Sequence, residues 1–343
     1  MTASQRPQRS SALRYAALAG ALILVGLGWT VAWNVLADRA DTELGRHLDR
    51  AAERGSRLVC GDRTISGYPF RFEVECTRPQ LVLARAGNLE VAATRLRLAG
   101  MIWQPLRLVG FLDGPAEIYD PRSGRRYKAS WTGAEGSVGF ATLHIDRISA
   151  VFSSLEVIEA DISDRAARLA AAGLEIHGRP SAGPDAGPGD VDIAVSADRL
   201  VLSDGTRTTP EIALAADTTA RNALDSLLGA RNLPDFLRQW QAADGALEIA
   251  AARLAVGADV LASGSGRLRL DDGGRLTGNL DASVAGLEKL LGPKNGLVAV
   301  LGAAVLGPET ELEGRKARTA RLRLDAGKVS LGPLAIAELA PLY

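Results

Sequence analysis

The sequence predicts a mainly β protein, built as a long antiparallel twisted sheet with a few covering helices and preceded by one N-terminal transmembrane helix. Three observations support this. After residue 58, short runs alternate aliphatic and polar residues, as strands do. Turns rich in Gly, Asn, Asp and Pro separate these runs. The longest uncharged apolar segment lies near the N-terminus, at residues 15–36.

This N-terminal segment, YAALAGALILVGLGWTVAWNVL, would span about 33 Å as a helix at about 1.5 Å per residue. Arginines precede it, while acidic and basic residues are mixed after it, so the positive-inside rule places the tail 1–14 in the cytoplasm and the chain after Leu36 on the other side of the membrane. Trp29 and Trp33 suit an interfacial belt at the far end. We expect a single-pass membrane protein.

A cleaved signal peptide is the alternative, because Val35-Leu36-Ala37 resembles a small-residue cleavage site. The apolar region of a signal peptide usually has about 7–15 residues, so the length here favours an uncleaved anchor. The charged residues 37–57 are expected to prolong the helix as a solvated stalk.

Both cysteines lie in the stretch 58–79, LVCGDRTISGYPFRFEVECTRP. In an oxidising compartment Cys60 and Cys76 are expected to form a disulfide that clips two strands around a turn. The bond closes a loop of about 17 residues, for which chain entropy gives roughly 3 kcal/mol of stability. A metal site is not expected, because partner ligands with zinc spacing are missing and the three histidines are far apart: His47, His144 and His177.

The turn between the cysteines offers a candidate recognition site made of Gly67, Tyr68, Pro69, Phe70 and Arg71. In this interpretation the turn presents the two aromatic rings, while the arginine meets an acidic partner or a phosphate. We favour a structural interpretation, in which Phe70 begins the core face of a strand, Pro69 sets the turn and Arg71 is solvated.

Further strands are expected in both parts of the chain, and the ambiguous segment 165–177 is assigned to a strand in preference to a helix. Helical spacing of apolar residues predicts helices near 219–242 and 287–306. The clearest strand predictions are 74–83, 89–98, 116–119, 127–131, 138–145, 155–158, 247–256, 260–270 and 275–284.

The Pro- and Gly-rich loop 181–190 is either a boundary between two β-rich halves, 58–180 and 191–343, or a long hairpin tip. Similar runs, LEVAATRLRL around Arg95 and LEIAAARLAV around Arg253, indicate a repeat, which would give two similar halves. The alternative is that strands rich in Ala and Leu resemble one another by composition.

The run ISGYPFRFEVEC, an N-terminal anchor and the ending LGPLAIAELAPLY together resemble the bacterial family of domain of unknown function 2125 (DUF2125), found chiefly in alphaproteobacteria. The resemblance implies a single-pass anchor in the bacterial inner membrane with the main, envelope-facing domain in the periplasm, and it brings no catalytic residues. The second half, with its successive strands and the DDGG turn at 271–274, is also similar to AsmA-type envelope proteins. That likeness implies a long curved sheet with an apolar groove and a role in lipid transport.

No nucleophile motif, dinucleotide fingerprint or P-loop is present, so we expect no catalytic, cofactor or metal residues and no enzyme activity. The 40 basic and 40 acidic residues balance, which argues against nucleic-acid binding. The leading hypothesis is non-enzymatic binding or transport of lipids or other apolar envelope molecules. The alternative is a scaffold that holds envelope proteins by a sheet edge or by the GYPFR turn.

Overall fold

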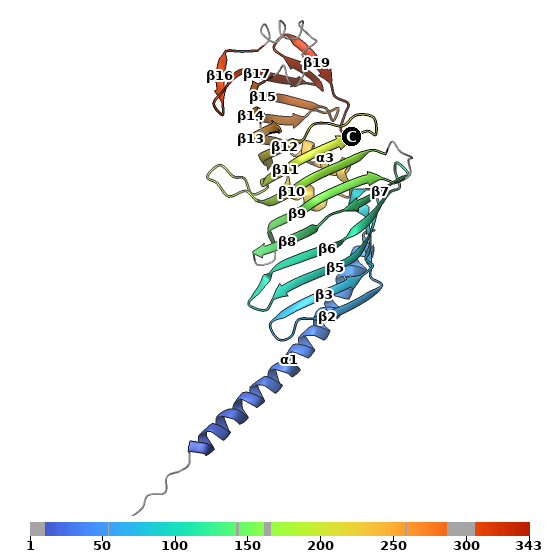
Figure 1. Ribbon diagram of the computed structural model, residues 1–343, viewed down its shortest axis with the longest axis vertical. Coiled ribbons are helices and arrows are strands. Elements are labelled where there is room, and N and C mark those ends of the chain that lie inside the picture. The colour runs from blue at the N-terminus through green and yellow to red at the C-terminus, as the bar shows by residue number, and fades with distance from the viewer. Residues whose placement is uncertain (1–10, 54, 142–143, 161–165, 258, 287–305) are drawn as a thin grey trace, which may run out of the picture.

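The computed structural model describes residues 11–53, 55–141, 144–160, 166–257, 259–286 and 306–343. Within them the chain forms one large antiparallel sheet, a long N-terminal helix that projects from one end of it, and two short helices on one of its faces (Figure 1). The expected mainly β architecture is confirmed.

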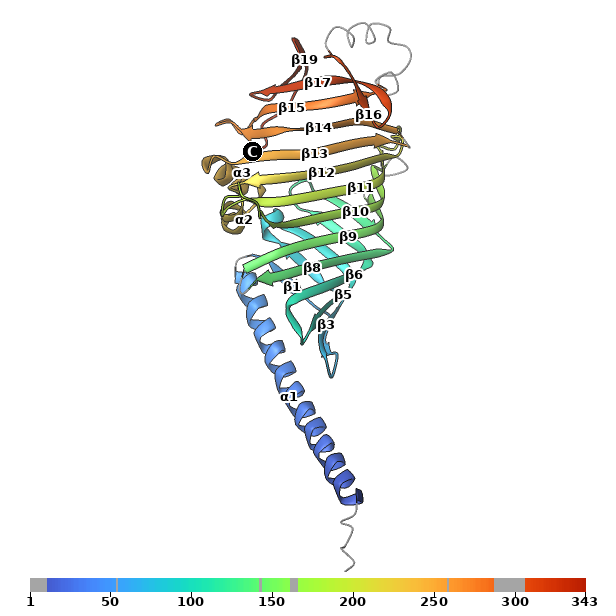
Figure 2. The same ribbon diagram turned by 90° about the vertical axis from the view of Figure 1, so that its left-hand side faces the viewer.

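The N-terminal helix α1 (Ser11–Glu53) is a single element of 43 residues. It includes the apolar stretch 15–36 and continues through most of the charged stretch that follows. It is the one helix in the described residues that is long and apolar enough to cross a membrane. In Figure 2 the C-terminal part of the helix lies beside the lower end of the sheet, and its N-terminal part projects beyond it.

Strands account for most of the remaining chain, and the described residues contain 19 of them. They are β1 (Arg57–Val59), β2 (Asp62–Ser66), β3 (Arg71–Thr77), β4 (Gln80–Leu83), β5 (Leu89–Met101), β6 (Gln104–Asp120), β7 (Arg125–Ser130), β8 (Gly133–Ala141), β9 (His144–Glu159), β10 (Arg168–Pro180), β11 (Val191–Ser203), β12 (Ile212–Arg221), β13 (Ala246–Val256), β14 (Asp259–Leu270), β15 (Leu276–Ala285), β16 (Glu309–Leu312), β17 (Arg315–Asp325), β18 (Lys328–Leu331) and β19 (Leu334–Glu338).

The strands follow one another through the sheet almost in sequence order, as a meander. The main order is β2-β3-β5-β6-β8-β9-β10-β11-β12-β13-β14-β15-β17-β18-β19. Three short additions widen it: β4 pairs with β5 and carries β1, β7 lies between β6 and β9 beside β8, and β16 pairs with β17.

Several strands differ in extent from their predictions. The predicted strand 74–83 is two strands, β3 and β4, because the chain turns at Arg78-Pro79, where Arg78 has a φ of 46°. The predicted strand 138–145 includes the end of β8 and the start of β9, which pair with each other. The ambiguous segment at 165–177 lies largely within β10, a strand as expected.

The two faces of the sheet differ in chemistry. Directly opposed residues project to the same side, so the pairing register assigns each side chain to a face. Ile176 and Val195 oppose each other on one face, and Glu175 and Ser196 on the other.

We call the first of these the apolar face. It includes Val74, Leu98, Leu108, Val138, Ile148, Ile176, Val195, Leu214, Leu254, Ala262, Val284, Leu322 and Leu331, which extend from β3 to β18. The opposite side is the polar face, with Glu75, Arg97, Glu135, Ser149, His177, Asp192, Asp217, Arg253, Arg267, Asp281, Arg321 and Lys328.

The two short helices, α2 (Leu224–Gly229) and α3 (Leu233–Ala242), cover the apolar face at one end of the strands β11–β15. They form where helices were expected, near 219–242. The side chain of Asn232 caps α3 by accepting a hydrogen bond from the N–H of Asp235, and a proline follows in the first turn. Trp240 is buried against Val191 and Leu270 of the sheet. The second expected helix, near 287–306, falls on residues outside the described part of the chain, apart from Leu306.

Residues 181–190 connect β10 and β11, which pair with each other from Arg168 to Pro180. The Pro- and Gly-rich loop is therefore a hairpin tip. Its last residue, Asp190, is 3% exposed and accepts hydrogen bonds from Arg221, at 2.7 Å, and from the N–H groups of Gly187 and Asn222. Burial alone would raise the pKa of Asp190, but these hydrogen bonds outweigh it and hold the pKa below its usual value.

We predict that Asp190→Asn lowers the free energy of unfolding by about 1–3 kcal/mol, because an NH2 group that cannot accept replaces one of the two carboxylate oxygens and leaves a buried donor without its acceptor. The depressed pKa of Asp190 also predicts a pH dependence. Its contribution is complete above the unfolded pKa of about 3.9 and is lost as the pH falls through the lower folded value. Denaturant unfolding between pH 7 and pH 3 measures both effects. A variant as stable as the wild type at pH 7 would contradict this role.

Candidate functional site

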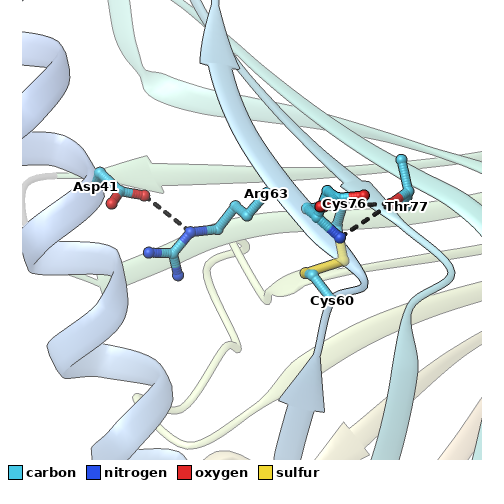
Figure 3. Close-up of a disulfide and its surroundings, with 6 residues drawn as sticks. Asp41, Cys60, Arg63, Cys76 and Thr77 are labelled. Carbon is cyan, nitrogen blue, oxygen red and sulfur yellow. Dashed lines mark hydrogen bonds and ion pairs between the residues drawn. A yellow bond between two sulfur atoms is a disulfide. The ribbon is translucent and has the colours of Figure 1, made fainter.

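The disulfide between Cys60 and Cys76 is present, as predicted, and lies where α1 meets the sheet (Figure 3). It connects the segment between β1 and β2 to the end of β3, with a Cα–Cα distance of 5.2 Å. Cys76 is buried. In Figure 3 Arg63 of β2 points toward α1, where its Nε lies 2.8 Å from the Oδ1 of Asp41. The disulfide-linked strands therefore hold the sheet against the helix.

The GYPFR turn joins β2 to β3 and lies against the apolar part of α1. The Nε1 of Trp29 donates a hydrogen bond to the carbonyl of Pro69 at 3.1 Å. The hydroxyls of Thr30 and Tyr68 are hydrogen-bonded at 2.9 Å. Two groups of the turn thus bind the chain's own helix, an arrangement that the sequence interpretation did not include.

An aromatic contact next to these hydrogen bonds joins the apolar face of the sheet to the helix α1. Trp33 of α1 is 9% exposed and stacks on Phe72, with ring centroids 5.7 Å apart and an interplanar angle of 5°. Its ring also meets Tyr68 edge-on at 5.6 Å. Phe72 lies on the apolar face, because it is two residues before Val74 in β3 and opposes Gly100, which is two residues after Leu98 in β5. The apolar face therefore begins in contact with α1.

Phe70 occupies a different position from the one we favoured. Strand β3 begins one residue later, and Phe70 is 58% exposed, so it does not begin the core face. Its one aromatic neighbour among the described residues is Trp103, with the ring centroids 6.2 Å apart. Arg71 forms an ion pair with Glu73 at 2.9 Å and is 54% exposed in its side chain, consistent with a solvated residue.

The middle of the apolar face is open to solvent. Five large aliphatic side chains on β6, β9, β10, β11 and β12 are each between 38% and 43% exposed: Leu108, Ile148, Ile176, Val195 and Leu214. Full burial of such a side chain is worth roughly 1.5–3 kcal/mol. A contiguous apolar surface of this kind marks an interaction site more often than a scattered residue does.

Glycines between these residues keep the apolar face shallow. A Cβ on Gly178 would lie 3.1 Å from the Cγ1 of Ile148, and one on Gly100 would lie 3.1 Å from a methyl group of Leu108. The neighbouring aliphatic side chains therefore lie partly over the glycine backbone. A larger residue at either position would lift them away from the sheet.

A hollow of about 1220 Å³ lies on the polar face, toward the β5–β6 turn. Asp192 occupies one side of it and accepts hydrogen bonds from Ser181, Thr219 and Arg179. Burial opposes ionisation of Asp192, but these hydrogen bonds prevail and lower its pKa. The apolar groove that the sequence comparison implied is thus not this hollow.

His177 also borders the hollow, with its Nδ1 3.0 Å from the Oγ of Ser149 and its Nε2 3.2 Å from Glu175. A Ser-His-Glu reaction centre would also need donors for an oxyanion. Here β9 and β10 pair with each other along this stretch, so their backbone N–H groups are engaged in the sheet. Cross-strand hydrogen bonding accounts for the arrangement. In the described residues, no group of three or more His, Cys, Asp or Glu side chains is placed to hold a metal ion.

Arg95 and Arg253, the arginines of the two similar runs, lie on the polar face, as does Arg321 of β17. Arg95 and Glu75 are 3.5 Å apart, Arg253 and Glu313 2.7 Å, and Arg321 and Asp281 2.6 Å. Each arginine occupies the polar position of a strand whose neighbouring residues belong to the apolar face. Two-faced strands in a common sheet therefore account for this recurring pattern.

We predict that replacing both cysteines, Cys60→Ala with Cys76→Ala, lowers the free energy of unfolding by about 3 kcal/mol, as expected for a loop of about 17 residues. The measurement is thermal unfolding of the full chain in detergent. The oxidised wild type with an added reductant should match the variant. Equal stability of wild type and variant would show that the disulfide does not hold the hairpin.

A family model described as "Uncharacterized protein conserved in bacteria (DUF2125)" matches residues 33–340. No curated protein and no solved structure matches the chain. These comparisons therefore do not confirm the resemblance of the second half to AsmA-type proteins.

Proposed function

The chain belongs to this uncharacterised bacterial family, and from that premise we propose that it binds lipids or other apolar envelope molecules along its apolar face and supports their transport. The observation that carries the proposal is the continuity of this face. It starts under Trp33 of α1 and runs across successive strands, whose opposed apolar residues stay on one side of the sheet although bulges shift the register within several pairs. It is open at Ile176 and Val195.

The chemistry of the face fits flexible apolar chains. In its middle, from β6 to β11, the paired residues of this face are apolar side chains or glycines, so a ligand there would meet no side-chain hydrogen-bonding group that needs a matching partner. Specific small-molecule sites usually add a few convergent polar groups to an apolar pocket. An open aliphatic surface suits acyl chains, which differ little from one another in shape.

The location in the inner membrane, with the sheet in the periplasm, is part of the proposal. Retention of α1 is supported by the contacts of Trp29, Thr30 and Trp33 with the β2–β3 turn, since removal of the helix would expose Phe72 and leave Tyr68 without this partner. A cleavage after Ala37 would remove all three residues. The disulfide is consistent with an oxidising compartment.

A scaffold is the second candidate, and it is favoured by one observation. β19 (Leu334–Glu338) is the last strand of the described sheet, and all five of its residues are exposed. An exposed edge strand can pair with a strand of another protein. In this case partner binding would depend on β19 and not on the apolar face.

We predict that the double variant Ile176→Asn with Val195→Asn reduces co-purified lipid by about tenfold or more, because it places two amides opposite each other in the apolar face. The matched control is Glu175→Asn with Ser196→Asn, which changes the same two strands one residue away on the polar face. The full chain is purified in a mild detergent, and bound lipid is counted by native mass spectrometry and extraction.

The control should retain lipid at the level of the wild type. If wild type, variant and control all carry the same small amount, the apolar face does not bind lipid. Loss of a co-purified protein on a Pro substitution within β19, with lipid unaffected in every variant, would support the scaffold instead.

A further inference from the structure

Two hairpin tips beside α1 present large apolar side chains that the sheet does not use. They are the β2–β3 turn, with Tyr68 and Phe70, and the β5–β6 turn, with Trp103. Phe70 is 58% exposed and Trp103 63%. The carbonyl of Phe70 accepts a hydrogen bond from the N–H of Ile102 at 3.1 Å, so the two tips form one unit.

The surface extends beyond the aromatic rings. Met101 is 38% exposed and Leu106 49%, at the two ends of the β5–β6 turn. In both views the two hairpins form the end of the sheet that points along α1 toward its N-terminus (Figures 1 and 2). The exposed apolar side chains therefore cluster at one extremity of the sheet.

The tips are fixed at a defined level of α1. Trp29 and Thr30 hold the β2–β3 turn through Pro69 and Tyr68. Thr30 lies six residues before Leu36, the last residue of the uncharged stretch, which corresponds to about 9 Å of helix. A hydrocarbon core of about 30 Å accommodates about 20 residues of helix. If α1 crosses the membrane with this stretch, the tips lie level with its last two turns, inside the membrane boundary.

The residue types at the tips suit a position at the membrane interface. Trp and Tyr prefer the membrane interface, where the ring is in apolar surroundings and the polar atom can find a partner. Arg107, next to the β5–β6 turn, is exposed and can meet anionic headgroups. In water, the same rings would leave a large apolar patch uncovered.

We propose that the two hairpin tips insert into the leaflet of the membrane on the periplasmic side, with Phe70 and Trp103 among the lipid chains. This brings Leu106 and Leu108, the exposed residues at the start of the apolar face, to the level of the bilayer. Lipid would then reach the face from the membrane without passing through water. The inference rests on α1 as a retained span, which belongs to the proposed function, but not on lipid binding by the face.

The test is quenching of tryptophan fluorescence by brominated lipid. The full chain is reconstituted into phosphatidylcholine vesicles with or without bromine on the acyl chains. Single variants Trp103→Phe, Trp29→Phe and Trp131→Phe give the contribution of each ring by difference from the wild type. Trp131 is the control, because its Nε1 donates to the carbonyl of Leu112, about ten residues from the β5–β6 turn along β6.

The proposal expects the Trp103 contribution to be quenched to a similar extent as that of Trp29, while that of Trp131 is unchanged. Quenching of Trp29 without quenching of Trp103 would overturn the insertion of the tips and leave the anchor intact. If neither ring is quenched, α1 does not span the bilayer, and both the anchor and the insertion fail. Ile176→Asn with Val195→Asn should leave all three contributions as in the wild type, which separates this test from lipid binding by the face.

Discussion

The structure depends on strand pairing that keeps the apolar residues of successive strands on one side of the sheet, although bulges shift the register within several pairs. Strand side chains alternate between two faces, so a slip of one residue would send the apolar set of a strand to the polar side. The pairs Val74 with Leu98, Ile176 with Val195, and Leu280 with Leu322 lie on the same face although they are far apart in the chain. Ion pairs such as Arg321 with Asp281 reinforce the register from the other face, although exposed pairs contribute little each.

A sheet with one apolar face must cover that face or use it. In the described residues the face is covered in two places: α1 packs on β2 and β3 through Trp33, and α2 and α3 pack through Trp240 on one end of the strands β11–β15. The middle of the face remains open at Leu108, Ile176 and Leu214. A mobile apolar ligand would bury the exposed aliphatic residues without a fixed layer of protein. The helix α1 places one end of the open region beside the membrane that it is proposed to span.

Local patterns predicted much of this fold. Alternation predicted strands, the composition of 15–36 predicted a long apolar helix, and two cysteines in one stretch predicted their disulfide. Contacts between distant segments were not predictable in this way. The alternation at Phe70 extended β3 by one residue too many, because the hydrogen bonds of the turn to Trp29 and Thr30 come from 40 residues away. The hollow on the polar face also has no local signal, because it arises from how seven strands are placed together.

Photo-crosslinking in intact cells tests the central claim most directly. A benzophenone amino acid is placed at Leu108, Ile176 or Leu214 on the apolar face and at Ser149, Glu175 or Ser196 on the polar face. After irradiation, adducts of the full chain are identified by mass. The account predicts lipid adducts at the three apolar positions and none at the polar ones. Equal lipid labelling of both faces, or protein adducts alone at the apolar positions, would contradict it.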